Sequence, residues 1–294
     1  MSSKDLRWMN VALSEALRSE GRTGSNPPVG CALVDSSGQL VSVGHTGRGG
    51  TPHAEIAAIQ SIVKRDLDIE IIKGGTAYVT LEPCSHFGKT PPCVAALIDS
   101  GIKRVVIALK DPDKRVNGKG VSALVASGIE VDVGVGASAA FETLEGYFKR
   151  QKEGVPHCLL KVATSLDSRI ALADFKKRWI TGHEMRNYIH LLRSRVDGII
   201  TGIGTIISDN PKMTCRLGAS PSDSPQLYVF DSLLRTPLGS DVLKRLDPPT
   251  FFSCKDVDQD RKKALEDAGA KVVHLPTSKE GSLDIWAALK YLGK

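Results

Sequence analysis

Residue types that can bind a metal ion and move protons occur in two short stretches of the first third of the chain. His53 and Glu55 lie two positions apart where a helix is expected to begin. Cys84 follows an expected strand, and Cys93 opens the next expected helix. One imidazole and two thiolates suit zinc, and three protein ligands leave the ion one open position for water. Zinc lowers the pKa of that water toward neutrality, and Glu55 is then placed to carry a proton from the water to a departing amine.

The order of these residues is that of the zinc nucleobase deaminases, whose signature is His-x-Glu followed by Pro-Cys-x-x-Cys. Here residues 85–92 separate the two cysteines, where the signature has two residues. Two other interpretations stay open at this point. His86 is a rival for the place of Cys93, and a fourth protein ligand would make the zinc purely structural.

The elements that must position these residues alternate between helix and strand. In the first half, apolar spacing predicts helices between Ser3 and Gly21 and at about 53–65, 93–100, 121–127 and 138–150. Strands are expected at 29–34, 40–44, 76–81, 104–109 and 129–133, of which the first two form a hairpin. Such alternation is typical of a layered α/β sheet.

A polar run at 151–154, before Pro156, marks a domain boundary, so we expect one domain at 1–150 and a second at 156–294. The second half predicts strands at 159–163, 198–201, 227–230 and 271–274 and helices at about 184–195, 256–268 and 283–292. No internal repeat is visible. The sequence ends directly after an expected helix, where an α/β domain normally continues with another strand.

Composition narrows the class of protein. The 294 residues, 41% hydrophobic and 24% charged, exclude a disordered chain and a single small module. The net charge of +6 favours anionic ligands such as phosphates, and no run of five like charges occurs. No apolar stretch approaches the roughly 18 residues of a membrane span, and six scattered cysteines form no disulfide framework. We therefore expect a cytoplasmic protein.

The run 80–93, Thr-Leu-Glu-Pro-Cys-Ser-His-Phe-Gly-Lys-Thr-Pro-Pro-Cys, resembles the deaminase half of a bifunctional riboflavin-biosynthesis family. In that family a diaminohydroxyphosphoribosylaminopyrimidine deaminase is joined to a 5-amino-6-(5-phosphoribosylamino)uracil reductase, and the long insert between the cysteines is normal. The stretches 26–30 (Asn-Pro-Pro-Val-Gly), 52–55 (Pro-His-Ala-Glu) and 118–120 (Gly-Lys-Gly) are similar to the family as well.

The resemblance implies a zinc-dependent hydrolytic deamination of 2,5-diamino-6-(5-phosphoribosylamino)pyrimidin-4(3H)-one. His53, Cys84 and Cys93 would then hold one zinc ion, with Glu55 as the proton shuttle. Asn26 would hold the pyrimidine edge, and Lys89 would meet the ribose phosphate as a point charge. Asp113 stands where the family has Asn, which leaves its contact with substrate open.

The second half resembles the reductase of this family, in the stretches 160–167, 179–181, 190–193 and 209–216. The implied fold is α/β throughout: a three-layer, cytidine-deaminase-like domain followed by a dihydrofolate-reductase-like domain that is incomplete at its C-terminal end. The resemblance implies an NADPH site lined by Ala163, Trp179, Thr205, Asp209 and Ser232. It implies a site for the phosphorylated reductase substrate lined by Arg193, Met213 and Arg216, whose guanidinium groups suit a phosphate.

Three departures from the family concern the reductase half. Ser168 replaces a usual Gly, Lys177 stands where Ser is common, and the sequence ends before the Glu-Gly-Gly segment that completes both pockets. Without the backbone donors of that glycine loop the cofactor pyrophosphate is held less well. We therefore expect weak or absent reductase activity, with NADPH oxidation as the deciding assay.

The expected partners are a small phosphoribosyl pyrimidine and further copies of this chain, in a dimer or tetramer as is usual in the family. No membrane or nucleic-acid partner is expected, because no basic stripe with interleaved aromatic residues is present and only 5% of residues are aromatic. Two alternatives remain: a zinc deaminase acting on another base or nucleoside, free or in tRNA, and a non-catalytic zinc module.

Overall fold

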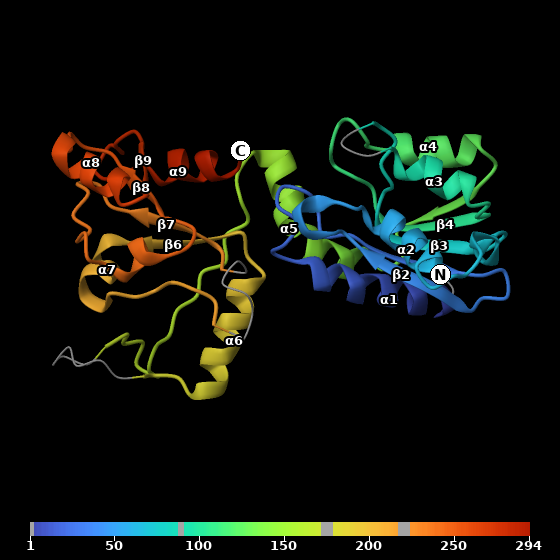
Figure 1. The fold of residues 1–294 in the computed structure, drawn as a ribbon, viewed down its shortest axis with the longest axis horizontal. Helices are drawn as coiled ribbons and strands as arrows, with labels where there is room; N and C mark the ends of the chain where they lie inside the picture. The colour runs from blue at the N-terminus through green and yellow to red at the C-terminus, as the bar shows by residue number, and fades with distance from the viewer. Residues whose placement is uncertain (1–2, 88–90, 172–178, 217–223) are drawn as a thin grey trace. The chain divides into compact units, whose positions relative to one another are not determined.

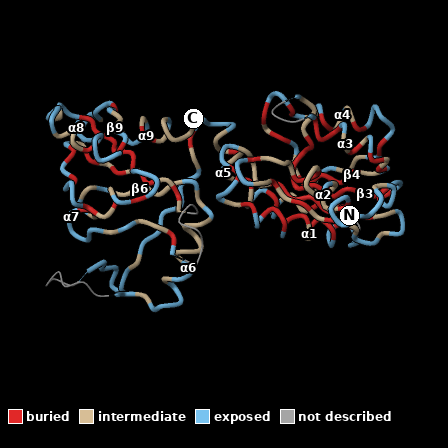
Figure 2. The backbone as a smooth tube through the Cα atoms, viewed as in Figure 1, coloured by how far each residue is buried: buried red, intermediate tan, exposed pale blue. Residues whose placement is uncertain are grey.

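The computed structural model describes residues 3–87, 91–171, 179–216 and 224–294 (Figure 1). The chain divides into two compact units, Met1–His157 and Cys158–Lys294. Each unit has buried apolar clusters of its own (Figure 2), so each is described separately below. In the described residues, no helix has both the length and the apolar character needed to cross a membrane.

The first unit is built on one mixed sheet of order β2-β1-β3-β4-β5. Its strands are β1 (Gly30–Val34), β2 (Leu40–His45), β3 (Thr76–Leu81), β4 (Arg104–Leu109) and β5 (Glu130–Val133). β1 pairs antiparallel with β2 and β3, whereas β3, β4 and β5 are parallel. The carboxyl ends of β3 and β4 therefore meet at one edge of the sheet, and the segment with Cys84 begins at that edge.

Helices cover both faces of this sheet (Figure 1). The helices are α1 (Ser3–Ser19), α2 (Ala54–Val63), α3 (Cys93–Asp99), α4 (Lys119–Ala126) and α5 (Ala137–Glu153). One face packs against α1 and the beginning of α5, and the other packs against α2, α3 and α4. The resulting arrangement has three layers. α1 approaches β1 closely because Gly30 has no side chain: a Cβ there would lie 1.8 Å from the Ala12 carbonyl oxygen.

The second unit contains a parallel sheet of order β6-β7-β8-β9. Its strands are β6 (Gly198–Gly202), β7 (Gln226–Phe230), β8 (Thr250–Ser253) and β9 (Lys271–His274). Helices α7 (Ile203–Asp209) and α8 (Gln259–Asp267) pack on one face, and α9 (Ile285–Leu292) packs on the other. α6 (His183–Ser194) is amphipathic but has no buried residue.

Three elements of the second unit differ from the expectations drawn from the sequence. The strand expected at 159–163 is absent: the segment forms no sheet pairing in the described structure, and Leu160 is 86% exposed. An extended segment becomes a strand only where a neighbouring strand supplies hydrogen-bond partners. Conversely, β8 and α7 form without having been expected. β8 is a strand of four residues, and periodicity cannot distinguish so short an apolar run from a loop.

Candidate active site

The imidazole of His53 is placed by the turn that leads into α2. His53 occupies the position just before α2, with extended backbone angles, so its side chain projects from the beginning of the helix. The loop before it is closed by a hydrogen bond from the Gly47 N–H to the Pro52 carbonyl (2.8 Å). His53 is therefore held at the edge of the sheet by backbone geometry.

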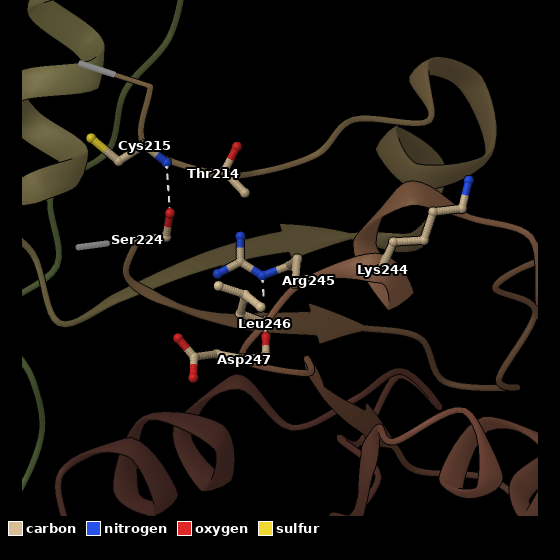
Figure 3. A pocket seen from close by; sticks show the side chains of 7 residues that line it. All are labelled: Thr214, Cys215, Ser224, Lys244, Arg245, Leu246 and Asp247. Atoms are coloured by element: carbon tan, nitrogen blue, oxygen red, sulfur yellow. Dashed lines mark hydrogen bonds between the residues drawn. The ribbon is translucent and has the colours of Figure 1, made fainter. Parts of the chain in front are cut away.

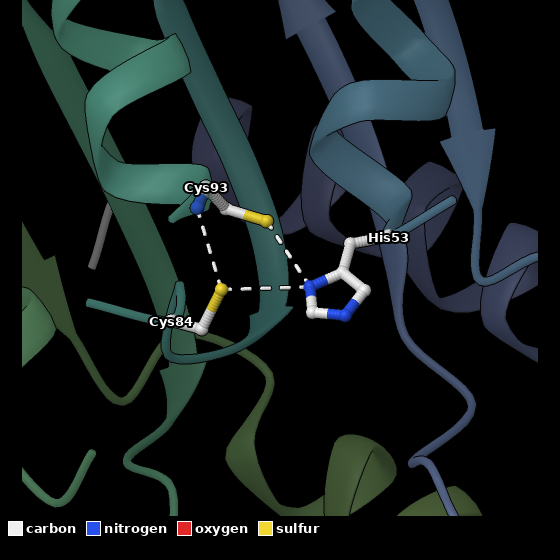
Figure 4. A group of neighbouring side chains, drawn as sticks. All are labelled: His53, Cys84 and Cys93. Carbon is white, nitrogen blue, oxygen red and sulfur yellow. Dashed lines mark hydrogen bonds between the residues drawn. The ribbon is translucent and has the colours of Figure 1, made fainter. Parts of the chain in front are cut away.

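The two thiols come from the segment after β3 and from the first residue of α3 (Figure 4). Nδ1 of His53 lies 3.2 Å from Cys93 Sγ and 3.5 Å from Cys84 Sγ. The Cys93 N–H donates to Cys84 Sγ (3.3 Å), and the Val94 N–H donates to the Cys84 carbonyl (3.2 Å). The structure thus brings together three residues that are up to 40 positions apart in sequence.

This donor set fits a zinc ion. All three ligand atoms lie within 4.8 Å of one another. Zn–N and Zn–S bonds of about 2.1 and 2.3 Å in a tetrahedron separate the ligand atoms by roughly 3.6 Å, close to the observed spacing. A hydrogen bond from the Cys93 thiol, together with His53, lowers the pKa of Cys84 to about 4, and the same hydrogen bond raises the pKa of Cys93. Cys84 and Cys93 thus share one proton in the absence of a metal ion, and a divalent cation would displace that proton on binding.

Within the described residues, no fourth His, Cys, Asp or Glu joins this group, so the ligand set has an open position. His86, the rival ligand in the sequence, is not a member of the group. Its Nδ1 atom is buried and has no hydrogen-bond partner in the described structure. The interpretation as a closed structural zinc site therefore has no support in this arrangement.

Glu55 lies in the first turn of α2, two residues after His53, and is 3% exposed. Burial, with the Cys84 thiolate as the next cause, raises the pKa of Glu55 to about 7. A carboxyl group with a pKa near neutrality can both accept and donate a proton.

Asn26 lies on the loop before β1, and its position depends on a glycine. A Cβ atom on Gly50 would lie 1.7 Å from Asn26 Nδ2, and Gly50 has a φ of +92°. This glycine is three residues before His53, so the loop that places Asn26 leads directly into the metal site. Lys89, the expected phosphate contact, lies outside the described residues.

Glu82 is a residue whose role sequence analysis missed. Its carboxylate is 3% exposed and accepts hydrogen bonds from three backbone N–H groups, those of Asp111 (3.2 Å), Gly118 (2.9 Å) and Val121 (3.1 Å). It thereby joins the end of β3 to the loop 111–118 and to the beginning of α4. No pattern in the sequence marks this role, because a carboxylate that accepts backbone N–H groups has no characteristic spacing.

The loop 111–118 also holds Asp113, whose role the sequence left open. Asp113 is buried, and Arg115 donates two hydrogen bonds to its Oδ2 (3.0 and 2.5 Å). The pKa of Asp113 is lowered chiefly by Arg115 and in part by His86, so Asp113 stays ionised. Its carboxylate is thus engaged by a neighbouring arginine.

The residues expected to line the NADPH site divide into two groups. Thr205, Asp209 and Ser232 follow the carboxyl ends of the neighbouring strands β6 and β7, the edge at which open parallel sheets bind ligands. Ala163 lies in the extended segment outside the sheet. Trp179 is 78% exposed, with the Arg186 guanidinium 4.5 Å from its ring centre. Lys177 lies outside the described residues.

The expected substrate residues of the second unit converge beside α6. Arg216 contacts His190 of α6 through Nη2 (3.3 Å) and through its backbone N–H (3.2 Å to Nδ1). Arg193 donates to the Thr214 carbonyl (3.1 Å). Burial, and then the charge of Arg216, lowers the pKa of Arg193. The charge of Arg216 thus acts on Arg193, and a pair of guanidinium groups of this kind attracts an anion.

The backbone of Met213, the third expected substrate residue, accepts a hydrogen bond from a buried arginine, Arg245. Arg245 donates to the carbonyl oxygens of Met213 (2.5 Å), Pro225 (2.6 Å) and Asp247 (3.3 Å). Arg245 lines a cavity of about 270 Å³, as do Thr214 and Ser224 (Figure 3). Arg245 ties three segments together, so it sets the course of the chain between Met213 and Arg216.

Comparison with known proteins matches a different family model to each half of the chain. Residues 2–109 match the family model described as the cytidine and deoxycytidylate deaminase zinc-binding region, and residues 156–294 match the RibD C-terminal domain. The riboflavin biosynthesis protein RibD of Aquifex aeolicus is 39% identical over 92% of this chain and 74% of its own length. The RibD protein of Escherichia coli is 39% identical over 78% of this chain and 61% of its own length.

Solved structures show the same likeness over both units. The RibD structure of Acinetobacter baumannii has a TM-score of 0.83 and 33% identity, covering 98% of this chain and 77% of that one. A diaminohydroxyphosphoribosylaminopyrimidine deaminase/5-amino-6-(5-phosphoribosylamino)uracil reductase of Thermotoga maritima has a TM-score of 0.79 and 31% identity, covering 92% and 80%.

The fold, the metal-ligand group and these matches define a zinc-dependent deaminase joined to an NADPH-dependent reductase. The chain belongs to the RibD family of riboflavin biosynthesis enzymes.

Proposed function

We propose that the first unit catalyses the hydrolytic deamination of 2,5-diamino-6-(5-phosphoribosylamino)pyrimidin-4(3H)-one to 5-amino-6-(5-phosphoribosylamino)uracil and ammonia. The observation that carries this proposal is the group of His53, Cys84 and Cys93, which is open at one position and has buried Glu55 two residues from its histidine ligand. The printed name of the Thermotoga maritima structure supports the choice of substrate.

In this mechanism His53 Nδ1 and the two cysteine sulfurs hold the zinc ion. Zinc, when bound, lowers the pKa of a water and so supplies the nucleophile at neutral pH. Glu55 accepts one proton of the attacking water on a carboxylate oxygen and delivers it to the ring nitrogen. It then carries the second proton, from the hydroxyl group of the adduct, to the leaving amine, so that a carbonyl group remains on the ring carbon. The water oxygen bonds to the ring carbon that carries the amine, the C–N bond breaks, and ammonia leaves.

Two further residues bind the substrate in this proposal. The amide of Asn26 donates to and accepts from the pyrimidine edge, and Gly50 fixes where that amide lies. Lys89 pairs with the ribose phosphate. Neither residue takes part in proton transfer, so their loss is expected to act mainly on KM.

The test is Glu55→Gln, which keeps the shape of the side chain and removes its base. We expect the rate of ammonia release to fall about 10³-fold, while bound zinc stays near one ion per chain. The control is Glu142→Gln, because Glu142 is exposed on α5, away from the metal ligands. Wild-type ammonia release by Glu55→Gln would overturn the role of Glu55.

Because the matches to the family extend over the second unit, we propose NADPH-dependent reduction of the ribosyl group to the ribityl chain there, in place of the weak or absent activity expected from the sequence. Ala163, Trp179, Thr205, Asp209 and Ser232 would line the cofactor site, and Arg193, Met213 and Arg216 the substrate site. The contacts of Arg193 and Arg216 with α6 and its neighbouring segment support a site for a phosphorylated sugar. NADPH oxidation in the presence of the deaminated intermediate tests the activity, and no oxidation above the background without that intermediate would contradict it.

We further propose a cytoplasmic homo-oligomer, a dimer or tetramer, that acts on a small molecule and binds no nucleic acid. Large apolar side chains exposed on the second unit, among them Leu160, Trp179 and Trp286, support self-association. Light scattering of the purified chain measures the mass of the assembly, and a monomer at micromolar concentration would contradict the proposal.

A further inference from the structure

The last turns of α5 lie beside the metal site of the first unit. Along α5 the apolar residues change from one face of the sheet to the other: Ala140 packs in the cluster on the α1 face, whereas Leu144 and Phe148 pack in the cluster on the α2 face. The Tyr147 hydroxyl donates to Asp111 Oδ1 (3.0 Å), two residues past the end of β4. The end of α5 is therefore at the carboxyl edge of the sheet, where the segment with the first cysteine ligand begins.

The contact made by Tyr147 acts on the loop that borders the metal site next to Cys84. The Asp111 N–H donates to the carboxylate of Glu82 (3.2 Å), which lies two residues before Cys84. Asp111 is 7% exposed, and its Oδ1 also accepts from the Asp113 N–H (2.8 Å). Its Oδ2 has no hydrogen-bond partner in the described part of the chain. Because a carboxylate accepts through both oxygens, Oδ2 is the atom that remains for a ligand.

Arg150, three residues after Tyr147, acts on the turn before β1. Its Nη2 donates to the Ser25 carbonyl (2.5 Å), and its guanidinium lies 5.9 Å from the Tyr147 ring centre. The turn is also closed internally, because the Thr23 hydroxyl donates to the Asn26 carbonyl (2.6 Å) and the Asn26 N–H donates to the Thr23 carbonyl (3.3 Å). The contact with Ser25 therefore fixes the backbone that carries the Asn26 amide.

We propose that Tyr147 and Arg150 are positioning residues for the deamination, which hold two loops beside the metal site at the separation that the pyrimidine requires. This inference rests on the function proposed for the first unit. Tyr147 orients Asp111, whose Oδ2 accepts from an amino or hydroxyl group of the substrate, and Arg150 orients the Asn26 amide. One helix turn thus sets two substrate contacts that come from loops more than 80 residues apart in the sequence. Neither side chain belongs to the metal-ligand group, so we expect both to act on KM.

The first experiment measures kcat and KM for ammonia release by the full chain. Tyr147→Phe removes the hydroxyl alone, and Arg150→Ala removes the guanidinium. We expect each to raise KM about tenfold, with kcat within about twofold of the wild type and zinc near one ion per chain. Arg150→Lys can still donate to a carbonyl and should recover part of the loss. The control is Lys149→Ala, because Lys149 lies between the two residues on α5 and pairs with Glu153 (3.1 Å).

Double variants test whether each residue acts through its partner. Once Asp111→Asn has removed the acceptor that faces the substrate, adding Tyr147→Phe should raise KM by less than about twofold more. Likewise, adding Arg150→Ala to Asn26→Ala should raise KM by less than about twofold more. Single and double variants whose effects on KM multiply would show independent actions and would overturn the inference.

The remaining outcomes separate this inference from the proposed function. Wild-type KM in Tyr147→Phe and Arg150→Ala would overturn the inference and leave the deamination intact. Loss of zinc and of kcat at unchanged KM would show a general role in stability and would overturn it as well. Absence of ammonia release from the wild-type, zinc-loaded chain would overturn the proposed function. Calorimetric binding of the substrate to Glu55→Gln requires no turnover, and Tyr147→Phe in that background should weaken it about tenfold.

Discussion

Gly50 lies so close to Asn26 that a Cβ atom on the glycine would fall 1.7 Å from the Asn26 amide nitrogen. Gly50 is buried and has a φ of +92°, in the left-handed region that other residues rarely adopt. The position of the asparagine amide thus depends on the absence of a side chain three residues before His53.

Gly50→Ala should therefore displace the Asn26 amide. We expect the KM for deamination to rise about tenfold or more, equivalent to at least about 1.4 kcal/mol, with zinc content unchanged. Gly49→Ala is the matched control: Gly49 also has a positive φ, of +73°, but a Cβ there meets no atom within 4 Å. If both variants raised KM equally, the cause would be backbone strain and not contact with Asn26.

Glu82→Gln should loosen the loop 111–118. An amide keeps one carbonyl oxygen, so it cannot accept from all three N–H groups that the Glu82 carboxylate now serves. Leaving a buried N–H without an acceptor costs about 1–3 kcal/mol of unfolding free energy. Urea unfolding followed by tryptophan fluorescence measures this loss in a Trp179→Phe/Trp286→Phe background, in which Trp8, buried in the first unit, is the remaining tryptophan. Glu142→Gln should unfold as the wild type does, and equal unfolding of Glu82→Gln would contradict the assigned role.

Removal of the metal should abolish deamination without changing the second unit. We expect Cys84→Ala and Cys93→Ala each to reduce bound zinc from one ion per chain to less than about a tenth of that, because two remaining ligands bind zinc weakly. Cys158→Ala serves as the control, since Cys158 is exposed and lies in the other unit. Zinc content by mass spectrometry is the measurement, and full zinc occupancy in Cys93→Ala would restore His86 as a candidate ligand.

The pair formed by Asp5 and Arg104 should make stability depend on pH. Arg104 donates to both oxygens of Asp5 (2.7 and 3.2 Å) and, with some opposition from burial, lowers the pKa of that carboxyl group. A depressed folded-state pKa stabilises the protein above the unfolded value, about pH 4, and this contribution disappears as pH falls through the folded pKa.

Asp5→Asn is thus expected to lower the unfolding free energy by about 2 kcal/mol at pH 7. Its difference from the wild type should shrink as pH falls below about 4. Asp99→Asn, on the exposed end of α3, should show no such pH-dependent difference. Trp8 fluorescence again reports the first unit, and a deficit of Asp5→Asn that stays constant down to pH 2 would refute the linkage.

The alternation of helices and strands in the first unit could be predicted from sequence because its strands are buried and bounded by turns. β1, for example, is buried at all five positions between a proline pair and a turn. The metal ligands could be proposed because their residue types are rare in combination, and the structure adds that their atoms meet. By contrast, Glu82 could not be assigned, because a carboxylate that accepts backbone N–H groups has no characteristic spacing in the sequence.

The second unit was harder to predict because pairing, and not local preference, decides which of its extended segments become strands. The segment at 159–163 has suitable residues but no pairing in the described structure, whereas the short strand β8 pairs with β7 on one side and with β9 on the other. Similarly, α7 has seven residues and follows β6 without a break, so its apolar residues could not be separated from those of the strand.

Each apolar cluster is formed by residues of a single unit, and all three zinc ligands lie in the first unit. In an architecture of this kind, each half can be gained, lost or altered independently during evolution. Genes encoding the halves could fuse or separate at the junction after His157 without redesigning either interior, and changes that inactivate one half need not impair the other.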